Sequence, residues 1–178
     1  FYNDYSNLIE SCSFSAGCDT DIAFSGGSVD VYGIEVSTGS EYDLGNGTKI
    51  PLNLNYTYTD SEFKETFYSP FSLWNFVEAG NPLPYLAEHQ ATFSIGLESS
   101  DWGVNAYVVY NDAMPESGQS RLTGSTLDNP LSGKFSDSFT VIDISAYYQL
   151  TESIRGYLKI DNLLDDASIV SRRPYGAR

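Results

Sequence analysis

The chain has 178 residues, with 9 Lys and Arg against 24 Asp and Glu, a formal net charge of −15 and an aromatic content of 15%. The acid excess argues against nucleic-acid binding, which needs clustered Lys and Arg, and the aromatic content argues against intrinsic disorder. The longest obvious apolar run, residues 106–110, is far shorter than the roughly 20 residues of a membrane-spanning helix. These features do not exclude a membrane β-barrel, whose strands show only a weak alternating pattern.

The two ends of the sequence suggest a piece of a longer protein. The chain opens on residues 1–9, a strand-like stretch of unclear phase, with no initiator Met and no signal peptide. It closes on residues 172–178, which have the composition of a loop. We therefore expect further residues on both sides of this segment.

Two cysteines, Cys12 and Cys18, are separated by small and polar residues that would let the chain turn back on itself. This pair predicts a local disulfide in an oxidising compartment, with two free thiols as the main alternative. A metal site would need further Cys or His ligands, and the sole histidine, His89, lies far away in sequence. We predict no metal site and no cofactor.

Six later segments alternate apolar and polar residues with a period of two, which is the pattern of a half-exposed strand. Together with residues 1–9 they predict seven strands; the six segments are residues 32–44, 50–58, 91–97, 104–110, 142–150 and 154–160. Their charged residues all fall on the polar phase: Glu35, Glu41, Asp43, Glu98, Asp143, Arg155, Lys159 and Asp161. The two faces therefore meet different solvents. Either a lipid-facing sheet or a soluble sheet with one face on a core would produce this pattern.

The connections between the predicted strands favour the first of these two alternatives. Short and long connections strictly alternate along the chain: residues 45–49, 99–101 and 151–153 are short, and residues 10–27, 60–90, 112–138 and 165 onward are long. In an up-and-down meander every short turn then lies at one end, as in outer-membrane barrels with short periplasmic turns and long extracellular loops. We predict an all-β, antiparallel meander of about seven strands of a transmembrane β-barrel. Aromatic residues of the apolar phase near strand ends fit interfacial girdles: Tyr42, Tyr56, Tyr58, Trp102, Tyr110 and Tyr148.

The final segment resembles a known family. Residues 159–165 read Lys-Ile-Asp-Asn-Leu-Leu-Asp, and residues 171–178 read Ser-Arg-Arg-Pro-Tyr-Gly-Ala-Arg. Together they resemble the penultimate strand and last extracellular loop of TonB-dependent outer-membrane receptors, most closely the ferric-dicitrate type. In that family the strand ends in Asn-Leu-Phe-Asp, and here Leu164 stands in place of the Phe.

The resemblance implies a parent barrel of about 22 strands, closed by an N-terminal plug, in the bacterial outer membrane. Residues 1–178 would be a C-terminal segment of that barrel, without the plug and the last strand. Such a receptor is a transporter and not an enzyme. It imports ferric chelates, such as a siderophore or ferric citrate, or another scarce nutrient, using energy from TonB. Its partners would be that small nutrient, TonB through the N-terminal part, and outer-membrane lipid and lipopolysaccharide.

Candidate ligand-binding residues lie in the long connections. Arg172 and Arg173 form a basic cluster in an acidic chain and could capture an anionic ferric chelate, because guanidinium groups suit carboxylates. The alternative is that they pack against other loops or bind lipopolysaccharide phosphates. Gln119 and Arg121, in another long connection, could face the same vestibule. The net charge of −15 would oppose the approach of an anion.

No catalytic constellation is visible, since the carboxylates are scattered and no Ser, His and Asp set has a plausible context. Two alternatives to a TonB-dependent receptor stay open at this point. One is a fragment of a porin-type barrel without a plug. The other is a soluble β-sandwich binding module.

Overall fold

The computed structural model describes residues 1–12, 21–69, 76–116, 135–170, 172–173 and 176–177. Within these ranges every regular element is a β-strand, and no helix is long and apolar enough to cross a membrane. Seven strands form the main sheet: β1 (Tyr2–Tyr5), β4 (Val29–Asp43), β5 (Lys49–Phe63), β8 (His89–Glu98), β9 (Trp102–Asn111), β10 (Phe139–Thr151) and β11 (Ile154–Ile160). Three short hairpins lie in the connections: β2 (Ile9–Cys12) with β3 (Ile22–Ser25), β6 (Phe67–Tyr68) with β7 (Phe76–Val77), and β12 (Arg172–Arg173) with β13 (Gly176–Ala177).

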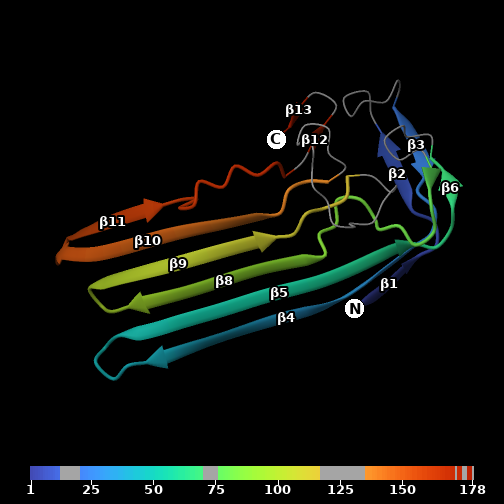
Figure 1. Cartoon of the computed structure of the whole chain (residues 1–178). Coiled ribbons are helices and arrows are strands. Elements are labelled where there is room, and N and C mark those ends of the chain that lie inside the picture. Colours follow the sequence, from blue (N-terminus) through green and yellow to red (C-terminus); the bar gives the residue numbers. More distant parts are fainter. Residues whose placement is uncertain (13–20, 70–75, 117–134, 171, 174–175, 178) are drawn as a thin grey trace.

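The main sheet is an antiparallel meander in which each strand pairs with the next sheet strand along the chain. Figure 1 shows one layer of long strands, with the tight turns together at one end and the long connections at the other. Among the described residues, β1 and β11 are the edges, so the sheet is open. The predicted fold class, strand count and strand order are confirmed.

Glycine and asparagine shape the short turn between β4 and β5. Between β4 and β5, Gly45 and Gly47 adopt φ values of 77° and 78°, a region that costs glycine little because it has no Cβ. The Leu44 amide donates to the Thr48 carbonyl at 2.9 Å, and the Asn46 side chain accepts from the Thr48 amide at 3.1 Å. Both of these hydrogen bonds are made within the hairpin.

The pairing register joins the apolar phases of the strands into one continuous face. One row across the sheet shows this, because its members are Cα partners in succession: Thr38, Leu54, Phe93, Val108 and Ile142. Large apolar side chains of this face are solvent-exposed in the chain, with Ile34 and Leu158 both at 62%. No second sheet in the described part of the chain covers them, so the arrangement is not that of a β-sandwich.

Aromatic residues border the apolar face at both ends. Tyr32, Tyr58 and Tyr110 lie toward the long connections, whereas Tyr42, Trp102 and Tyr148 lie toward the tight turns. From Tyr32 to Tyr42 the strand covers about 33 Å, and a strand tilted by about 45° spans about 23 Å of that along the membrane normal. This agrees with the apolar band of about 25 Å in outer-membrane barrels.

The polarity of the two faces reverses beyond the aromatic row that lies toward the long connections. Past Tyr32 and Tyr58, the phase that was polar carries Val29 and Phe63, which are almost fully buried and pack with Val77 of β7. The phase that was apolar now carries Asp30 and Glu62, which are register partners. The small hydrophobic core of the structure lies here, under the long connections rather than on the broad sheet. In this part of the strands the packing is therefore that of a water-exposed protein, with a small apolar core on one side and carboxylates on the other.

After β11 the chain follows the start of β10 through a backbone bond from the Leu163 amide to the Ile142 carbonyl at 2.7 Å and through several side-chain hydrogen bonds. Asn162 and Asp165 adopt φ values of 50° and 52°, where Asn and Asp are more tolerant than other side chains. The Asn162 side chain bonds the backbone of Asp166 in both directions, at 2.9 and 3.0 Å. The Asp166 carboxylate accepts from the Thr140 amide at 3.0 Å, so this segment fixes the connection against β10.

Candidate functional site

The polar face of the sheet carries amide and hydroxyl side chains that bond one another across the strands. Ser37 donates to Asn55 Oδ1 at 2.7 Å, and Asn55 Nδ2 donates to Thr92 Oγ1 at 3.0 Å. Closer to the long connections, Gln90 Nε2 donates to Asn111 Oδ1 at 2.7 Å, and Asn111 Nδ2 donates to the Asp112 carbonyl at 2.8 Å. These bonds hold flexible side chains in defined orientations, as a water-exposed binding wall requires.

A groove with a cavity volume of about 290 Å³ opens on this face. Two register rows of the polar phase supply most of its wall. The upper row runs across β5, β8, β9 and β10 through Thr57, Gln90, Asn111 and Phe139, and the lower row through Asn55, Thr92 and Val109. Ala91 and Tyr110 complete the lining. The strands place the groove next to the long connections and away from the tight turns.

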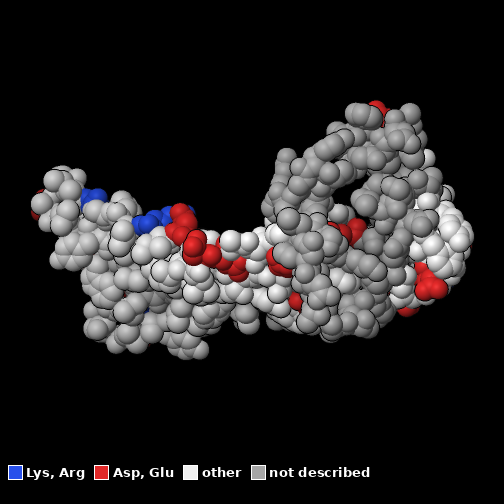
Figure 2. Space-filling view, turned by 45° about the horizontal axis from the view of Figure 1, so that its top comes forward, with Lys and Arg blue, Asp and Glu red and all other residues white. Residues whose placement is uncertain are grey.

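Two ion pairs lie on the polar face, and the carboxylate residue Glu35 is the register partner of Thr57 in the upper row of the groove. Lys49 Nζ lies 2.6 Å from Glu41 Oε1, and Lys159 Nζ lies 2.6 Å from Asp161 Oδ1. In Figure 2 the Lys and Arg side chains on the visible face gather toward the tight-turn end, and acidic side chains follow along the sheet. All four partners are at least half exposed, so each pair adds little to stability.

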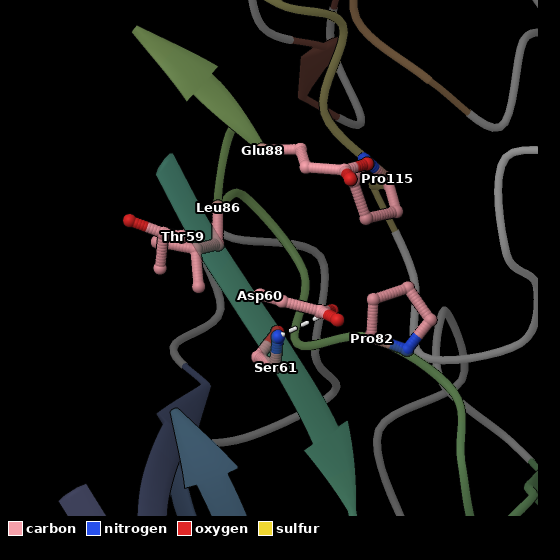
Figure 3. A pocket seen from close by; sticks show the side chains of 7 residues that line it. All are labelled: Thr59, Asp60, Ser61, Pro82, Leu86, Glu88 and Pro115. Carbon is pink, nitrogen blue, oxygen red and sulfur yellow. Dashed lines mark hydrogen bonds between the residues drawn. The ribbon is translucent and has the colours of Figure 1, made fainter. Parts of the chain in front are cut away.

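A smaller cavity of about 90 Å³ lies under the long connections. Its walls are residues of β5 and of the two connections above it: Thr59, Asp60, Ser61, Pro82, Leu86, Glu88 and Pro115. In Figure 3 the Asp60 side chain extends toward Pro82, and Glu88 extends toward Pro115. Asp60 is already engaged, because it accepts from the Tyr32 hydroxyl at 2.8 Å and from the Ser61 amide at 2.8 Å. The cavity is therefore part of the packing that supports the connections.

One lysine beside the loop core is held by two carboxylates. Lys64 Nζ lies 3.1 Å from Asp4 Oδ2 and 3.3 Å from Asp30 Oδ1. Its hydrogen bonds to Asp4 and then Asp30 raise the pKa of Lys64 above its ordinary value. The ion triad ties β1 and β4 to the residue that follows β5, and leaves this cation neutralised.

The structure describes only two of the four sequence-predicted ligand residues. Arg172 and Arg173 form β12, which pairs with β13 through Ala177 and Gly176 at the end of the long connections (Figure 1). Gln119 and Arg121 lie outside the described residues, as does Cys18, the predicted disulfide partner of Cys12. Cys12 itself ends β2, opposite Ile22. The ligand-capture and disulfide predictions therefore stay predictions.

Sequence reasoning missed the groove, although each of its residues was on the predicted polar phase or beside it. Gln90 and Asn111 fall one residue outside the alternating segments, and Phe139 precedes the predicted strand. What the sequence lacked was the register, which aligns Thr57, Gln90, Asn111 and Phe139 in one row. The signal available in the sequence was Phe139, an aromatic residue on the same alternation phase as the polar residues of its strand.

The chain matches a protein-family model. The family model described as TonB dependent receptor-like, beta-barrel matches residues 1–163. Comparisons with curated proteins and with solved structures return no match.

Proposed function

Because the chain belongs to the TonB-dependent receptor-like β-barrel family, we propose that it is part of an active transporter that imports a ferric chelate or a similar scarce nutrient with energy from TonB. The family consists of outer-membrane transport proteins of Gram-negative bacteria. Residues 1–178 form a C-terminal segment of the barrel wall in this proposal. The ferric chelate would be a siderophore or ferric citrate.

One observation carries the proposal: the sheet has one continuous apolar face bordered by aromatic rows and one wet face of amides and hydroxyls. A lipid-embedded wall needs the first, because exposed charge in hydrocarbon is costly. A solute path needs the second, because polar side chains replace water around a passing ligand. The long connections above the wet face supply a vestibule, to which Arg172 and Arg173 belong as the proposed contacts for an anionic chelate.

Uptake by intact cells tests the proposal. Cells that carry the whole parent receptor should take up radiolabelled ferric citrate or a ferric siderophore under iron limitation. Uptake should cease in an otherwise identical strain without TonB and in a strain without the receptor gene. Uptake that continues at the same rate without TonB would contradict active transport.

The basic residues can be tested in the same assay. Replacing Arg172 and Arg173 together by Ala should raise the concentration of an anionic chelate that gives half-maximal uptake several-fold. The reason is that two charge-assisted contacts are removed. Arg155→Ala is the matched control, because Arg155 lies on β11 beside the tight turns, where its guanidinium sits over the Tyr147 ring at 5.0 Å. Equal effects at both sites would show that the capture role is wrongly assigned.

A further inference from the structure

One pair of residues in a tight turn is chemically labile. Asn46 is followed by Gly47, the only Asn-Gly pair in the sequence. The pair lies in the turn between β4 and β5, at the end of the sheet away from the long connections (Figure 1). Asparagine is thermolabile, because the backbone nitrogen of the next residue can attack its side-chain carbonyl carbon. A side chain on that next residue hinders the attack, and glycine has none.

The turn holds one atom of the Asn46 side chain and leaves the other reacting atoms unbonded. The Thr48 amide donates to Asn46 Oδ1 at 3.1 Å. In the part of the chain that the structure describes, neither Asn46 Nδ2 nor the Gly47 amide makes a hydrogen bond. The oxygen that gains negative charge during the attack therefore already has a donor. The attacking nitrogen and the leaving nitrogen are both unrestrained.

Solvent has free access to this pair. Asn46 and Gly47 are exposed, and a Cβ added to Gly47 would meet no atom within 4 Å. A base can therefore reach the Gly47 amide, and a five-membered ring between the two residues would meet no obstacle. Gly47 has a φ of 78°, and the conformational freedom of glycine lets the backbone rotate as such a ring closes.

Asn162, which also lies outside the strands, has the opposite arrangement. Its Nδ2 donates to the Asp166 carbonyl at 2.9 Å, so the nitrogen that would leave is held. The next amide in the chain, that of Leu163, donates to the Ile142 carbonyl at 2.7 Å, so the nitrogen that would attack is held too. The structure thus protects Asn162 from the reaction to which it leaves Asn46 open.

Asn111, at the end of β9, is protected in the same way. Its Nδ2 donates to the Asp112 carbonyl at 2.8 Å, and the Asp112 amide donates to the His89 carbonyl at 2.9 Å. Asn111 is also buried, with 8% of its surface exposed. Asn111 and Asn162 are therefore internal references for the reactivity of Asn46 within one molecule.

We propose that Asn46 is a site of spontaneous covalent modification, at which the amide becomes a mixture of aspartate and isoaspartate. The Gly47 nitrogen loses its proton to a solvent base and forms a bond to Asn46 Cγ. The Cγ–Nδ2 bond breaks, and Nδ2 takes up a proton from water and leaves as ammonia. Water then opens the resulting succinimide at either carbonyl carbon, which gives aspartate or isoaspartate. The inference is independent of the proposed function, because it depends only on the turn.

The two products affect the turn differently. An aspartate oxygen accepts from the Thr48 amide as the asparagine oxygen does, so the turn keeps its hydrogen bonds and gains a negative charge. In isoaspartate the chain runs through Cγ, which lengthens the backbone by one carbon. The bond from the Leu44 amide to the Thr48 carbonyl, now 2.9 Å, should then weaken. Conversion therefore gives two receptor populations that differ at this end of the sheet.

Peptide mapping by mass spectrometry tests the site in the purified whole receptor, kept folded in detergent at mildly alkaline pH. The converted fraction at Asn46 should exceed that at Asn111 and at Asn162 by at least about tenfold, because only Asn46 has its reacting atoms free. Methyl transfer by a protein isoaspartate methyltransferase should label the same peptide. Asn46→Gln keeps the amide but would need a larger ring, and should abolish both signals.

The same receptor unfolded in guanidinium chloride shows what the turn contributes. If the turn leaves the site open, Asn46 in the folded receptor should convert at no less than about a tenth of its rate in the unfolded chain. A slower rate would show that the fold protects Asn46 and would overturn the inference. Equal conversion at Asn46 and Asn162 in the folded receptor, or methyl transfer that persists in Asn46→Gln, would overturn it as well.

Discussion

Leu54 shows at the scale of one residue why the two faces cannot be exchanged. It lies in the middle row of the apolar face, between Thr38 and Phe93, and its sequence neighbour Asn55 points to the wet face. Leu54→Arg in the parent barrel should cost about 2–4 kcal/mol, because a cation would face the bilayer midplane. We expect less heat-modifiable, folded receptor in the outer-membrane fraction on a denaturing gel.

Asn55→Arg is the matched control, because it introduces the same side chain one residue away on the water-exposed face. It should reduce assembly much less. Equal loss of folded receptor for the two variants would mean that the faces are assigned the wrong way round.

Single residues also show where sequence reasoning succeeded and where it stopped. Glu35, Asp143 and the other charges on the polar phase were predicted from alternation alone, because hydrocarbon excludes charge whatever the neighbours are. Asp30 and Glu62 could not be placed in this way. They break the alternation, and only the depth of the strand in the membrane makes a charge acceptable on the outward phase.

Among the elements, the long strands were predictable and the short hairpins were not. The strand β5 was expected to end near Tyr58 but continues to Phe63, because β4 keeps pairing with it beyond the membrane. The hairpin of β6 and β7 has only two pairs of residues, and it forms where Val77 packs on Val29 and Phe63. Such short hairpins form because of tertiary contacts, which local alternation in the sequence does not reveal.

The segment after β11 is held by one carboxylate whose charge state can be tested. Hydrogen bonds from the Ser168 side chain, the Thr140 amide and the Ser168 amide lower the pKa of Asp166 below its ordinary 3.8. A lowered folded-state pKa means that the charged form stabilises the segment above that ordinary value, and the stabilisation is lost as the pH falls through the lowered pKa. Amide exchange at Thr140 and Ser168, corrected for intrinsic rates, should therefore accelerate several-fold between about pH 5 and about pH 2.

Asp166→Asn removes the charge and keeps the shape of the side chain. In this variant both amides should already exchange faster at neutral pH, with little further change on acidification. The Leu44 amide, bonded to Thr48 at the far end of the sheet, is an internal control and should not respond to the substitution. Unchanged exchange at Thr140 in the variant would exclude Asp166 as the group that fixes the segment.

For the whole molecule, the alternation of short and long connections predicts its orientation in the membrane. Ala79 lies in the long connection after β7 and Asn46 in the tight turn after β4, and both are exposed. With a single Cys at each position of the parent receptor, a membrane-impermeant maleimide should label Ala79→Cys on intact cells and spare Asn46→Cys. After the outer membrane is permeabilised, both should react.

The receptor without added cysteine is the control, because it reports any reaction at Cys12 and Cys18. Labelling of Asn46→Cys rather than Ala79→Cys on intact cells would mean that the barrel is inserted the other way round.

At this scale the fold was largely predictable from sequence and the site was not. Period-two alternation and connection lengths are local properties, and they determined the meander. The groove depends on which residue of one strand faces which residue of the next, so that Thr57, Gln90, Asn111 and Phe139 meet in a row. A pairing shift of one residue would disperse that row while leaving the alternation of every strand unchanged.

The reversal of polarity above Tyr32 and Tyr58 has a mechanical consequence. From Thr59 to Phe63 the hairpin rises about 13 Å further along the strand as a stalk with its own interior around Val29. In the predicted orientation, with the long connections outward, an arriving solute meets this stalk before it reaches the part of the wall that carries the apolar face.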